Sequence, residues 1–402
     1  MFRLYDTRTG QVETIEPARR GLLRMYSCGP DADRRAHAGD LRGYLLTDLI
    51  RRNAEHRHHL SVLSCETVSD LGHPAQGEDR EEAFRADCSA LNLRPAEHLP
   101  RASEGIDPVI DIIARLVEAG HAYPTPGGSV YFDARSFASY GGLSGHRLAA
   151  LRPGDAPPGG AGGAGAAQKR FHADWALWEG TPAGRDPAWP APWGTGVPAR
   201  HAACSALSLR FLGDVIDIQT GGIDLLFPQH EDERAQSDSA TGHEVVRHWV
   251  HGEHLLFDGH ANAVRVADLT ARGLDPLALR LALLELRYRQ RANLTWDTLG
   301  AADLTLRRWR ELVAEWACSP SKPVHRPVAA RIAAAFDDDL DTPEALRSLH
   351  QLERDPDVAP GAKFESFAHA DQLLGLDLAR DVGQAPAEPP PREESDATIR
   401  FS

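Results

Sequence analysis

Lysine is scarce in this sequence. It occurs only as Lys169, Lys322 and Lys363, although the chain has 402 residues. Lysine and arginine together number 44, against 58 aspartates and glutamates, which gives a formal net charge of −14 at pH 7. Broad, non-specific binding of nucleic acid depends on lysines and arginines that neutralise many phosphates. The charge balance therefore argues against that class of function, while leaving room for a local basic track.

Long apolar stretches are also missing. The longest, Leu277 to Leu286, contains Arg280 and is too short to span a bilayer. The N-terminal residues, MFRLYDTRTG, lack the apolar core that a signal peptide would have. We therefore expect a cytoplasmic protein that has no membrane partner.

Cysteine is too sparse and too scattered to form a disulfide framework. The chain has five cysteines, at Cys28, Cys65, Cys88, Cys204 and Cys318. An odd number with such spacing predicts free thiols, and a metal-binding pair among them stays open. The remaining composition, 42% hydrophobic and 25% charged, is typical of a globular protein, and the length allows two or three domains.

The N-terminal part of the sequence predicts a strand, a helix and a second strand. Residues 22–28 (LLRMYSC) and 59–65 (HLSVLSC) are apolar enough for buried strands. Between them, leucines repeat at helical spacing from about Asp40 to Ala54, and Asp40 is a plausible N-cap. A strand–helix–strand unit predicts a parallel sheet, so we expect an α/β fold.

The rest of the chain mixes helices, strands and two segments that cannot pack a core. The Gly/Ala/Pro-rich stretch 153–167 predicts a flexible insert, and the Pro/Glu/Ser-rich end 383–402 predicts disorder. The other expected elements are an amphipathic helix over 104–119, a hairpin near 126–132, strands at 215–218 and 247–257, a helix from about Gln229, and mainly helices after about residue 268.

Several segments resemble one known family. They are YSCGPDADRRAHAGDLRGYLLTDLIRR near the start, Ser69-Asp70, KRFHADWALWEG (169–180), DPAWPAPWGTGVPARHAACSA (186–206), TGGIDLLFPQHEDERAQSDSA (220–240) and FDDDLDTPEAL (336–346). In this order and at this spacing, they resemble cysteinyl-tRNA synthetases and the mycothiol cysteine ligase. The chain is therefore identified as a divergent, shortened member of that class I synthetase family.

The resemblance implies a fold and a domain organisation. The expected fold is a class I synthetase Rossmann-type parallel sheet with an insertion, followed by a C-terminal helical domain. The implied parts are a catalytic domain with a connective insertion over 1–265, a helical stem-contact-like region over 266–310, a helical domain over 311–380 and a disordered tail over 381–402.

The same resemblance implies an ATP site. His37-Ala38-Gly39-Asp40 stands where the family has its HIGH tetrapeptide, at a helix N-terminus, which is a natural phosphate site. The second histidine of that tetrapeptide is replaced by Asp40. The family pattern makes His37 and Asp40 the catalytic candidates. It assigns nucleotide binding to Gly29, His37, Gly39, Gly221, Gly222 and Asp224.

A zinc ion binds in the amino-acid pocket of the family. Cys28, Cys204 and Glu233 match three of its ligands, and these donor types suit zinc. The fourth ligand, a histidine, is Gln229 in this chain. His230 lies beside it and shares a helix face with Glu233 at i, i+3 spacing, so it is a candidate replacement. Bound zinc and a vestigial site with buried thiols both remain open.

The amino-acid pocket itself departs from the family pattern. Arg200 stands where the family has tryptophan, while His201 matches and Ser69 takes the place of a threonine. A guanidinium suits an anionic group better than a small thiol. With Gln229 also changed, we expect these four residues to bind the amino acid substrate, which is either cysteine or, as we hypothesise, a different amino acid.

Two functions remain open. In the segment HGEHLLFDGHANAVRVADL (251–269), the lysine-bearing KMSKS loop of the family looks deleted after Asp258-Gly259. The resemblance implies an ATP-dependent ligase that forms an aminoacyl-adenylate and transfers the acyl group to tRNA or to a small amine. It does not extend to the anticodon-reading region, which argues against tRNA as the partner. The alternative is a catalytically degenerate paralogue that serves as a binding or regulatory module.

Overall fold

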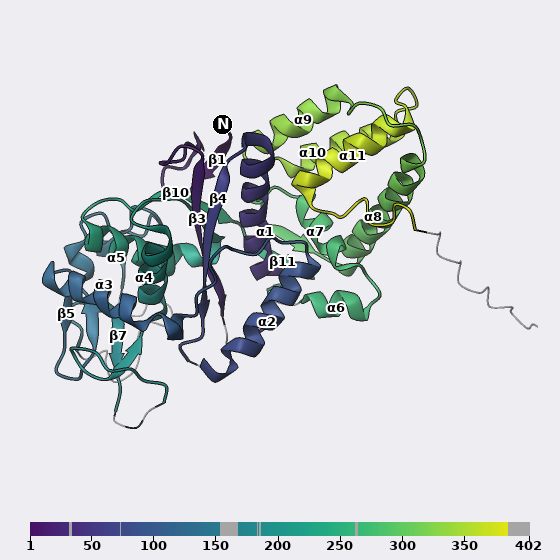
Figure 1. Ribbon diagram of the computed structural model, residues 1–402. Helices are drawn as coiled ribbons and strands as arrows, with labels where there is room; N and C mark the ends of the chain where they lie inside the picture. The colour runs from purple at the N-terminus through teal and green to yellow at the C-terminus, as the bar shows by residue number, and fades with distance from the viewer. Residues whose placement is uncertain are drawn as a thin grey trace, which may run out of the picture.

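The computed structural model describes residues 1–31, 34–72, 74–152, 168–182, 184, 186–261 and 264–384. The expected flexible insert at 153–167 and residues 385–402 of the expected tail lie outside these ranges. Figure 1 shows a central sheet seen nearly edge-on, a mixed α/β part on its left and a group of helices on its upper right.

A parallel sheet forms the centre of the described part of the molecule. Its four strands lie side by side in the order β10 (Val246–Gly252), β9 (Ile216–Gly222), β3 (Leu22–Asp31) and β4 (Ser61–Ser69). All neighbouring pairs are parallel. The α/β class predicted from the sequence is therefore confirmed.

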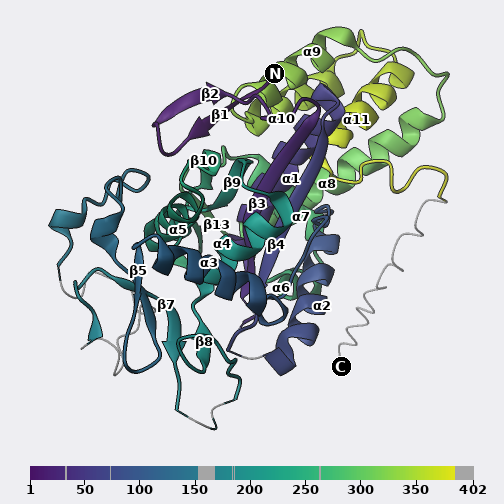
Figure 2. The same ribbon diagram turned by 60° about the vertical axis from the view of Figure 1, so that its left-hand side comes forward.

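The chain order creates a switch point in the middle of this sheet. Strand β3 continues through helix α1 (Ala38–Arg52) to β4 on one side, and β9 continues through α5 (Glu231–Thr241) to β10 on the other. The two connections leave neighbouring strands in opposite directions, so a crevice opens at the carboxyl ends of β3 and β9. Helix α1 covers one face of the sheet, and α4 (Arg200–Leu212) packs on the other (Figure 2).

Between β4 and β9 the chain builds a second, antiparallel sheet. Its strands are β5 (Ala122–Pro124), β6 (Val130–Phe132), β7 (Trp175–Gly180) and β8 (Gly196–Pro198), in that order. Helix α3 (Ile106–Glu118) packs against α4 and α5 and so ties this sheet to the central one. Stacked rings of Phe132 and Trp175, with centroids 4.4 Å apart, lie in its core.

The C-terminal part is mainly helical, as the sequence predicts. A small sheet of β11 (Leu255–Phe257), β12 (His260–Ala261) and β13 (Ala292–Leu294) lies between the two parts. The helices are α6 (Val266–Ala271), α7 (Pro276–Leu284), α8 (Trp296–Ala317), α9 (Arg326–Asp337), α10 (Thr342–Arg354) and α11 (Pro360–Leu374). The expected boundary after residue 310 falls inside α8.

Four local predictions need correction. The N-cap of α1 is His37, and Asp40 is its third helical residue. The helix expected from Gln229 starts at Glu231, after an irregular turn over Leu226–His230. The strand expected over 247–257 is two strands, β10 and β11, because the chain turns between them. The sequence analysis also missed α2 (Pro74–Ala90), whose apolar residues form no continuous stripe.

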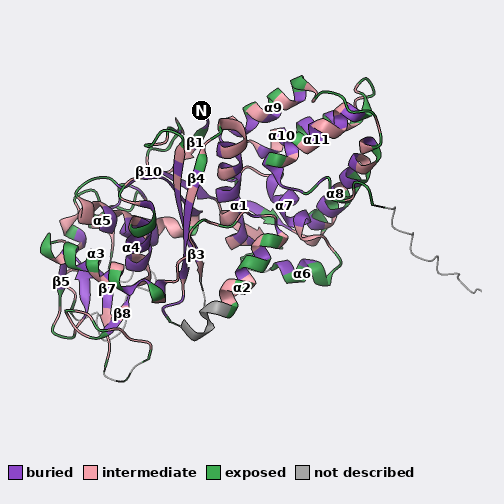
Figure 3. Ribbon diagram, viewed as in Figure 1, coloured by how far each residue is buried: buried purple, intermediate pink, exposed green. Residues whose placement is uncertain are grey.

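Helix α1 lies at the centre of the largest hydrophobic core. Its apolar face shares one buried cluster with α7, α8, α10 and α11, which Figure 3 shows as purple segments between the sheet and the C-terminal helices. A short antiparallel hairpin of β1 (Arg3–Asp6) and β2 (Gln11–Thr14) contributes Leu4 to the same cluster. One continuous core therefore joins the parallel sheet to the helical part.

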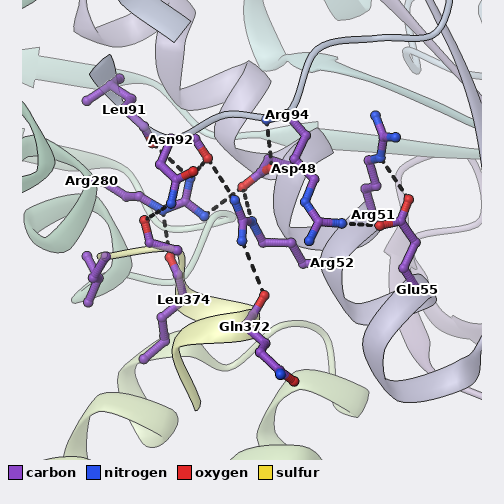
Figure 4. A network of polar contacts seen from close by, with 12 residues as sticks. Asp48, Arg51, Arg52, Glu55, Leu91, Asn92, Arg94, Arg280, Gln372 and Leu374 are labelled. Atoms are coloured by element: carbon purple, nitrogen blue, oxygen red, sulfur yellow. Dashed lines mark hydrogen bonds and ion pairs between the residues drawn. The ribbon is translucent and has the colours of Figure 1, made fainter. Parts of the chain in front are cut away.

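A buried polar network fixes α1 against the C-terminal helices (Figure 4). Arg280, which is 0% exposed, donates to Asp48 at 2.6 Å and to backbone carbonyls of Leu91 and Leu374. Arg52 donates to the same carboxylate at 2.7 Å. These arginines hold the pKa of Asp48 low against the opposing effect of burial. The network therefore links α1, the turn after α2, α7 and the end of α11.

Substitution of Arg280 by methionine tests this network. The variant leaves a buried carboxylate with one partner fewer and several carbonyls without a donor. We expect a loss of about 3–5 kcal/mol in the free energy of unfolding, measured by urea denaturation with tryptophan fluorescence. The control is Arg347→Gln, which breaks only an exposed pair with Glu344 and should leave the midpoint unchanged. Equal midpoints for the two variants would show that the network contributes little.

Candidate functional site

A cleft of about 560 Å³ opens at the switch point of the central sheet. It lies at the carboxyl ends of β3 and β9, next to the start of α1. We call it the switch-point cleft. Its lining includes Ser27, Cys28, Gly29, Arg34, His37, Gly39, Asp40, Arg42, Gly43, Tyr44, Arg200, Gly221, Gly222, Asp224, Glu253, His254 and Arg291.

The start of α1 presents His37 and Asp40 to this cleft. His37 Nδ1 accepts from the Asp40 N–H at 3.3 Å, and Asp40 accepts from the His37 N–H at 3.0 Å, so the two residues cap the helix reciprocally. The Nε2 atom of His37 is buried and makes no hydrogen bond within the described residues, although it lies 3.3 Å from Asp40 Oδ2.

The charge of Asp40 is balanced by an arginine in the preceding loop. Arg34 binds Asp40 with two hydrogen bonds, of 2.6 and 2.8 Å. Burial opposes ionisation of Asp40, but the Arg34 guanidinium and the His37 N–H together lower its pKa. Burial lowers the pKa of His37, which is therefore neutral at pH 7. The carboxylate that replaces the second family histidine thus enters the cleft as part of an ion pair.

Gly221 and Gly222 lie on the cleft wall opposite the start of α1, where neighbouring side chains leave no room for a Cβ atom. A Cβ atom at Gly221 would lie 2.7 Å from the His230 ring, and one at Gly222 would lie 2.2 Å from Asp224 Oδ1. At Gly43 on α1, a Cβ atom would lie 3.7 Å from the Gly222 backbone nitrogen. The helix start and the end of β9 therefore form two walls of one narrow cleft.

Gly29 and Gly39 are constrained in different ways. A Cβ atom at Gly29 would lie 2.4 Å from the Thr67 carbonyl oxygen, so this glycine allows β3 and β4 to approach each other. A Cβ atom at Gly39 would lie 3.1 Å from the His37 ring, a close contact that a small movement of the ring would relieve. Both residues line the cleft, as the family resemblance predicts.

Arg42 shapes the floor of the cleft without serving a ligand. Its guanidinium donates to the carbonyls of Glu253, His254, Arg287, Tyr288 and Gln290 at 2.7 to 3.3 Å. With all these bonds made inside the protein, Arg42 holds β11 and the chain before β13 against α1. Sequence analysis missed this residue, because nothing in the sequence separates it from an ordinary helix arginine.

The segment after β11 forms a tight turn. Asp258 and Gly259 both have positive φ, and Phe257 pairs with His260 in the returning strand. Asp-Gly is a preferred sequence for such a two-residue hairpin turn. The described lining of the cleft contains no lysine, and its permanently charged cationic side chains are arginines. Arg34, Arg291 and His254 are lining residues that the sequence analysis did not name.

Behind the cleft, three predicted metal ligands come together. The Cys28 thiol lies 3.2 Å from Glu233 Oε1 and 3.6 Å from His230 Nε2, and all three residues are buried. Gln229 donates to Cys28 at 3.0 Å and to Glu233 at 3.1 Å. The predicted involvement of His230 is thus consistent with its position.

The ring of His230 is held by a chain of polar contacts. Its Nδ1 lies 2.8 Å from His251 Nε2, and His251 Nδ1 lies 2.8 Å from the Thr7 hydroxyl. These contacts leave Nε2 directed toward Cys28. Burial lowers the pKa of His230 and that of His251, the latter to about 4, so both rings are neutral at pH 7. His251 could not be identified from the sequence, because its role follows only from its contacts with His230 and Thr7 in the folded chain.

Cys204 stands next to the three-residue cluster but outside its most compact part. It is buried in the same hydrophobic core as Cys28. Burial raises the pKa of the Cys28 thiol, and neighbouring Cys204 and Glu233 raise it further, while Arg200 opposes them. The Cys28 sulfur is therefore a neutral thiol, beside a Glu233 carboxyl whose pKa burial also raises.

The four predicted substrate residues lie in different places. Arg200 lines the switch-point cleft. Gln229 is part of the buried cluster, and His201 turns away to lie 3.0 Å from Asp232. Ser69 ends β4, opposite Asp31, and is not among the residues that line the cleft. Arg200 therefore belongs to the cleft and Gln229 to the buried cluster, whereas His201 contacts Asp232 and does not line the cleft.

The same geometry can be compared with known proteins. The family model of the class I (C) tRNA synthetase catalytic domain matches residues 14–303. The cysteine--tRNA ligase of Opitutus terrae is 36% identical over 98% of this chain and 89% of that protein. That of Alkalilimnicola ehrlichii is 38% identical over 88% of this chain and 79% of that protein.

Solved structures agree on the fold. Mycobacterium tuberculosis methionyl-tRNA synthetase bound by methionyl-adenylate superposes with a TM-score of 0.58, at 14% identity, over 90% of each chain. A leucyl-tRNA synthetase of Agrobacterium radiobacter, in a ternary complex with tRNA, gives a TM-score of 0.64 at 11% identity over 90% of this chain and 84% of that one. Within the described residues, no helix has the length and apolarity needed to cross a membrane.

The matched segment contains the whole switch-point cleft and the buried cluster behind it. The similarity to cysteine--tRNA ligases extends from there into the C-terminal helices. On this sequence match and this fold, the chain belongs to the cysteinyl-tRNA synthetase family of class I tRNA synthetases and is a ligase.

Proposed function

We propose that the switch-point cleft uses ATP to activate an amino acid as its aminoacyl-adenylate. One observation carries this proposal: the N-terminus of α1 and the Gly221-Gly222 end of β9 face each other across one cleft at the sheet's switch point. Such a crevice is where parallel α/β sheets bind nucleotides. Backbone N–H groups at a helix N-terminus favour phosphate.

The proposed reaction has two steps. A carboxylate oxygen of the amino acid attacks the α-phosphorus of ATP, the bond from that phosphorus to the bridging oxygen breaks, and pyrophosphate leaves. An acceptor hydroxyl or amine then attacks the carbonyl carbon, loses its proton and releases AMP. Neither step needs a covalent bond to the protein, so catalysis depends on positioning and on stabilised charge.

The cleft residues suit distinct parts of this reaction. His37 lines the cleft at the helix start, where phosphate oxygens would lie. Asp224 lines the same cleft and would bind the ribose hydroxyls. Arg34 and Arg291 line the cleft and could stabilise the charge on pyrophosphate, as the lysines of the family loop do. Arg34 is already bound to Asp40, so its net contribution to pyrophosphate is smaller than that of an isolated cation.

The buried cluster fits a zinc ion by chemistry and by spacing. Zinc binds cysteine, histidine and carboxylate ligands at about 2.0–2.3 Å, and a tetrahedral arrangement then separates neighbouring donor atoms by about 3.3–3.8 Å. The distance of 3.6 Å from Cys28 to His230 falls within that range, and the distance of 3.2 Å from Cys28 to Glu233 lies just below it. Cys28, His230 and Glu233 would hold the ion, with Cys204 beside them. When bound, zinc would supply a soft Lewis-acid position for the substrate side chain.

The substrate class follows from Arg200. Its guanidinium lines the cleft and affects the electrostatics of Cys28 at the end of β3. A guanidinium beside a metal position favours an amino acid with an anionic side chain, because a carboxylate can also bind zinc. We therefore propose that an acidic amino acid, or an anionic analogue of cysteine, is the substrate.

The relatives are tRNA ligases by name, and they support tRNA as the acceptor in the second step. A small amine would satisfy the same chemistry, because only a nucleophile at the carbonyl carbon is required. The switch-point cleft itself does not distinguish the two. Aminoacylation of total tRNA, compared with acylation of glucosamine, separates these acceptors once the amino acid is known.

A non-catalytic role is the second candidate. It is favoured by the tight turn at Asp258 and Gly259 and by the lysine-free lining of the described cleft. Loss of one aimed donor or cation at a transition state costs about 10²–10³ in rate. A protein that binds nucleotide without turnover would retain the walls of the cleft and lose adenylate formation.

Pyrophosphate exchange across the twenty amino acids tests the ligase proposal. We expect exchange with at least one amino acid, and a decrease of about 10²–10³-fold in His37→Ala, since a phosphate contact is lost. The matched control is His369→Ala on an exposed position of α11, which should exchange like the unmodified protein. ATP binding without exchange in folded protein would favour the non-catalytic role.

Replacement of Arg200 by tryptophan tests the substrate class. We expect the variant to lose affinity for aspartate relative to cysteine by about tenfold or more, because a desolvated charge contact is removed. Competition binding under ATP analogue measures this ratio, with Arg210→Gln, exposed on the same helix, as the control. If unmodified protein prefers cysteine to every acidic analogue, the anionic assignment is wrong while adenylate formation stands.

Metal analysis of purified protein tests the zinc site. We expect about one zinc per chain, loss of that zinc in Cys28→Ser, and tighter binding in Gln229→His, which adds an imidazole to the cluster. Cys65→Ser, also buried but outside the cluster, should keep its zinc. Equal zinc content in all four proteins would place the metal elsewhere, and no zinc in any would mark the cluster as vestigial.

A further inference from the structure

A second cavity lies on the other side of Tyr44 from the cleft. It has a volume of about 310 Å³ and opens between α1, β4, α2 and the chain that follows α2. This is within the size range of small-molecule sites. We call it the α1–α2 cavity. Its lining includes Tyr44, Thr47, Asp48, Arg51, Ser64, Glu66, Phe84, Arg85, Cys88, Leu93, Arg94 and Leu99.

Glu66 is the unusual member of this lining. It lies on β4, is only 9% exposed, and its carboxylate forms no ion pair within the described residues; the polar side chain beside it is Ser27. A buried carboxylate without a counter-charge is costly, so such groups are normally paired with a cation. Burial raises the pKa of Glu66 to about 7, although nearby Ser27 and Arg51 favour its ionised form.

The other charges around the cavity are already engaged. Arg51 binds Glu55 and Glu97, Arg85 binds Glu81, and Arg94 binds Glu55. Asp48 belongs to the network of Arg52 and Arg280. Cys88, which also faces Glu66, has a pKa raised first by burial and then by that carboxyl, so it is a neutral thiol. Glu66 is therefore the charge in this cavity that a ligand would meet.

Aromatic rings complete the site. Tyr44 and Phe84 pack edge to face, with centroids 4.8 Å apart, and both line the cavity. Burial and the nearby Glu66 raise the pKa of Tyr44, so the ring carries a neutral phenol. Ring faces attract cations, and Leu93 and Leu99 add apolar wall. An acidic group set among aromatic and aliphatic side chains matches an organic cation with an apolar body.

We propose that the α1–α2 cavity binds a small primary amine, with its ammonium group at Glu66 and its apolar part against Phe84 and Tyr44. An inorganic cation would leave the apolar walls unused, and an anion would meet the carboxylate. This site is distinct from the switch-point cleft and does not depend on the proposed ligase reaction.

The amine site contacts the cleft through one side chain. Tyr44 lines both spaces, and its hydroxyl donates to the Cys28 carbonyl at 3.2 Å. Ser27, which lines the cleft, pairs with Glu66 across β3 and β4. A ligand held at Glu66 therefore lies beside Ser27, which immediately precedes Cys28 of the buried cluster in the chain.

Calorimetric titration with phenethylamine tests the site, and 2-phenylethanol is the neutral probe of the same shape. We expect saturable binding of the amine, much weaker binding of the alcohol, and a loss of at least about tenfold in amine affinity in Glu66→Gln. Glu66→Gln is nearly isosteric and removes a buried charge, so it should fold. Glu82→Gln, exposed on α2, is the matched control and should bind as the unmodified protein does.

Two further measurements separate this site from the cleft. Cys88→Phe, which fills the cavity, should abolish amine binding, while saturating ATP should not displace the amine. Affinity should increase from pH 6 to pH 8, because Glu66 ionises near pH 7 while the amine stays protonated. Unchanged affinity in Glu66→Gln, displacement by ATP, or equal binding of amine and alcohol would each overturn the proposal.

Discussion

The parallel pairing of β3 with β9 is the constraint on which the rest of the site depends. The register pairs Ser27 with Thr220, the last paired residues of the two strands, so Cys28-Gly29 follows beside Gly221-Gly222. A buried contact of 2.7 Å between the hydroxyls of Thr47 and Thr220 fixes α1 on the same strands. A shift of register by one residue would turn the side chains to the other face. Cleft and buried cluster would then both be lost.

Scarce lysine gives arginine most of the cationic roles in this fold. A guanidinium donates in a planar fork, so one side chain can satisfy several carbonyls at once. Arg42 does this beneath the cleft, and Arg280 does it between α1 and α11. Both arginines are almost fully buried, and their charge is compensated by acceptors inside the protein. An arginine count therefore overstates the positive charge that this protein presents to a nucleotide or to a nucleic acid.

The elements whose residue pattern is local could be predicted from the sequence, whereas the residues whose role depends on partners far along the chain could not. Apolar runs predicted β3, α1 and β4, because strand and helix periodicities are local. The family motifs predicted the cleft walls, and the structure brings His37 and Gly221 into one cleft. Helix α2 has no apolar stripe, so its signal was too weak. Arg42, His251 and Glu66 act through partners more than twenty residues away or through a cavity, and no spacing in the sequence encodes those contacts.

Two of the departures from the family pattern, at Asp40 and at Gln229, each lie beside a residue that can compensate for the change. Asp40 adds a negative charge at the proposed phosphate site, but Arg34, six residues earlier, neutralises it with two hydrogen bonds. Gln229 removes an imidazole, but His230 directs one toward Cys28 from the next position, held there by His251. Each of these losses thus has a neighbour that compensates it. The tight turn at Asp258 is the departure for which the described residues offer no equivalent replacement, so in the proposed reaction the departure of pyrophosphate is the step at which this ligase should differ most from its relatives.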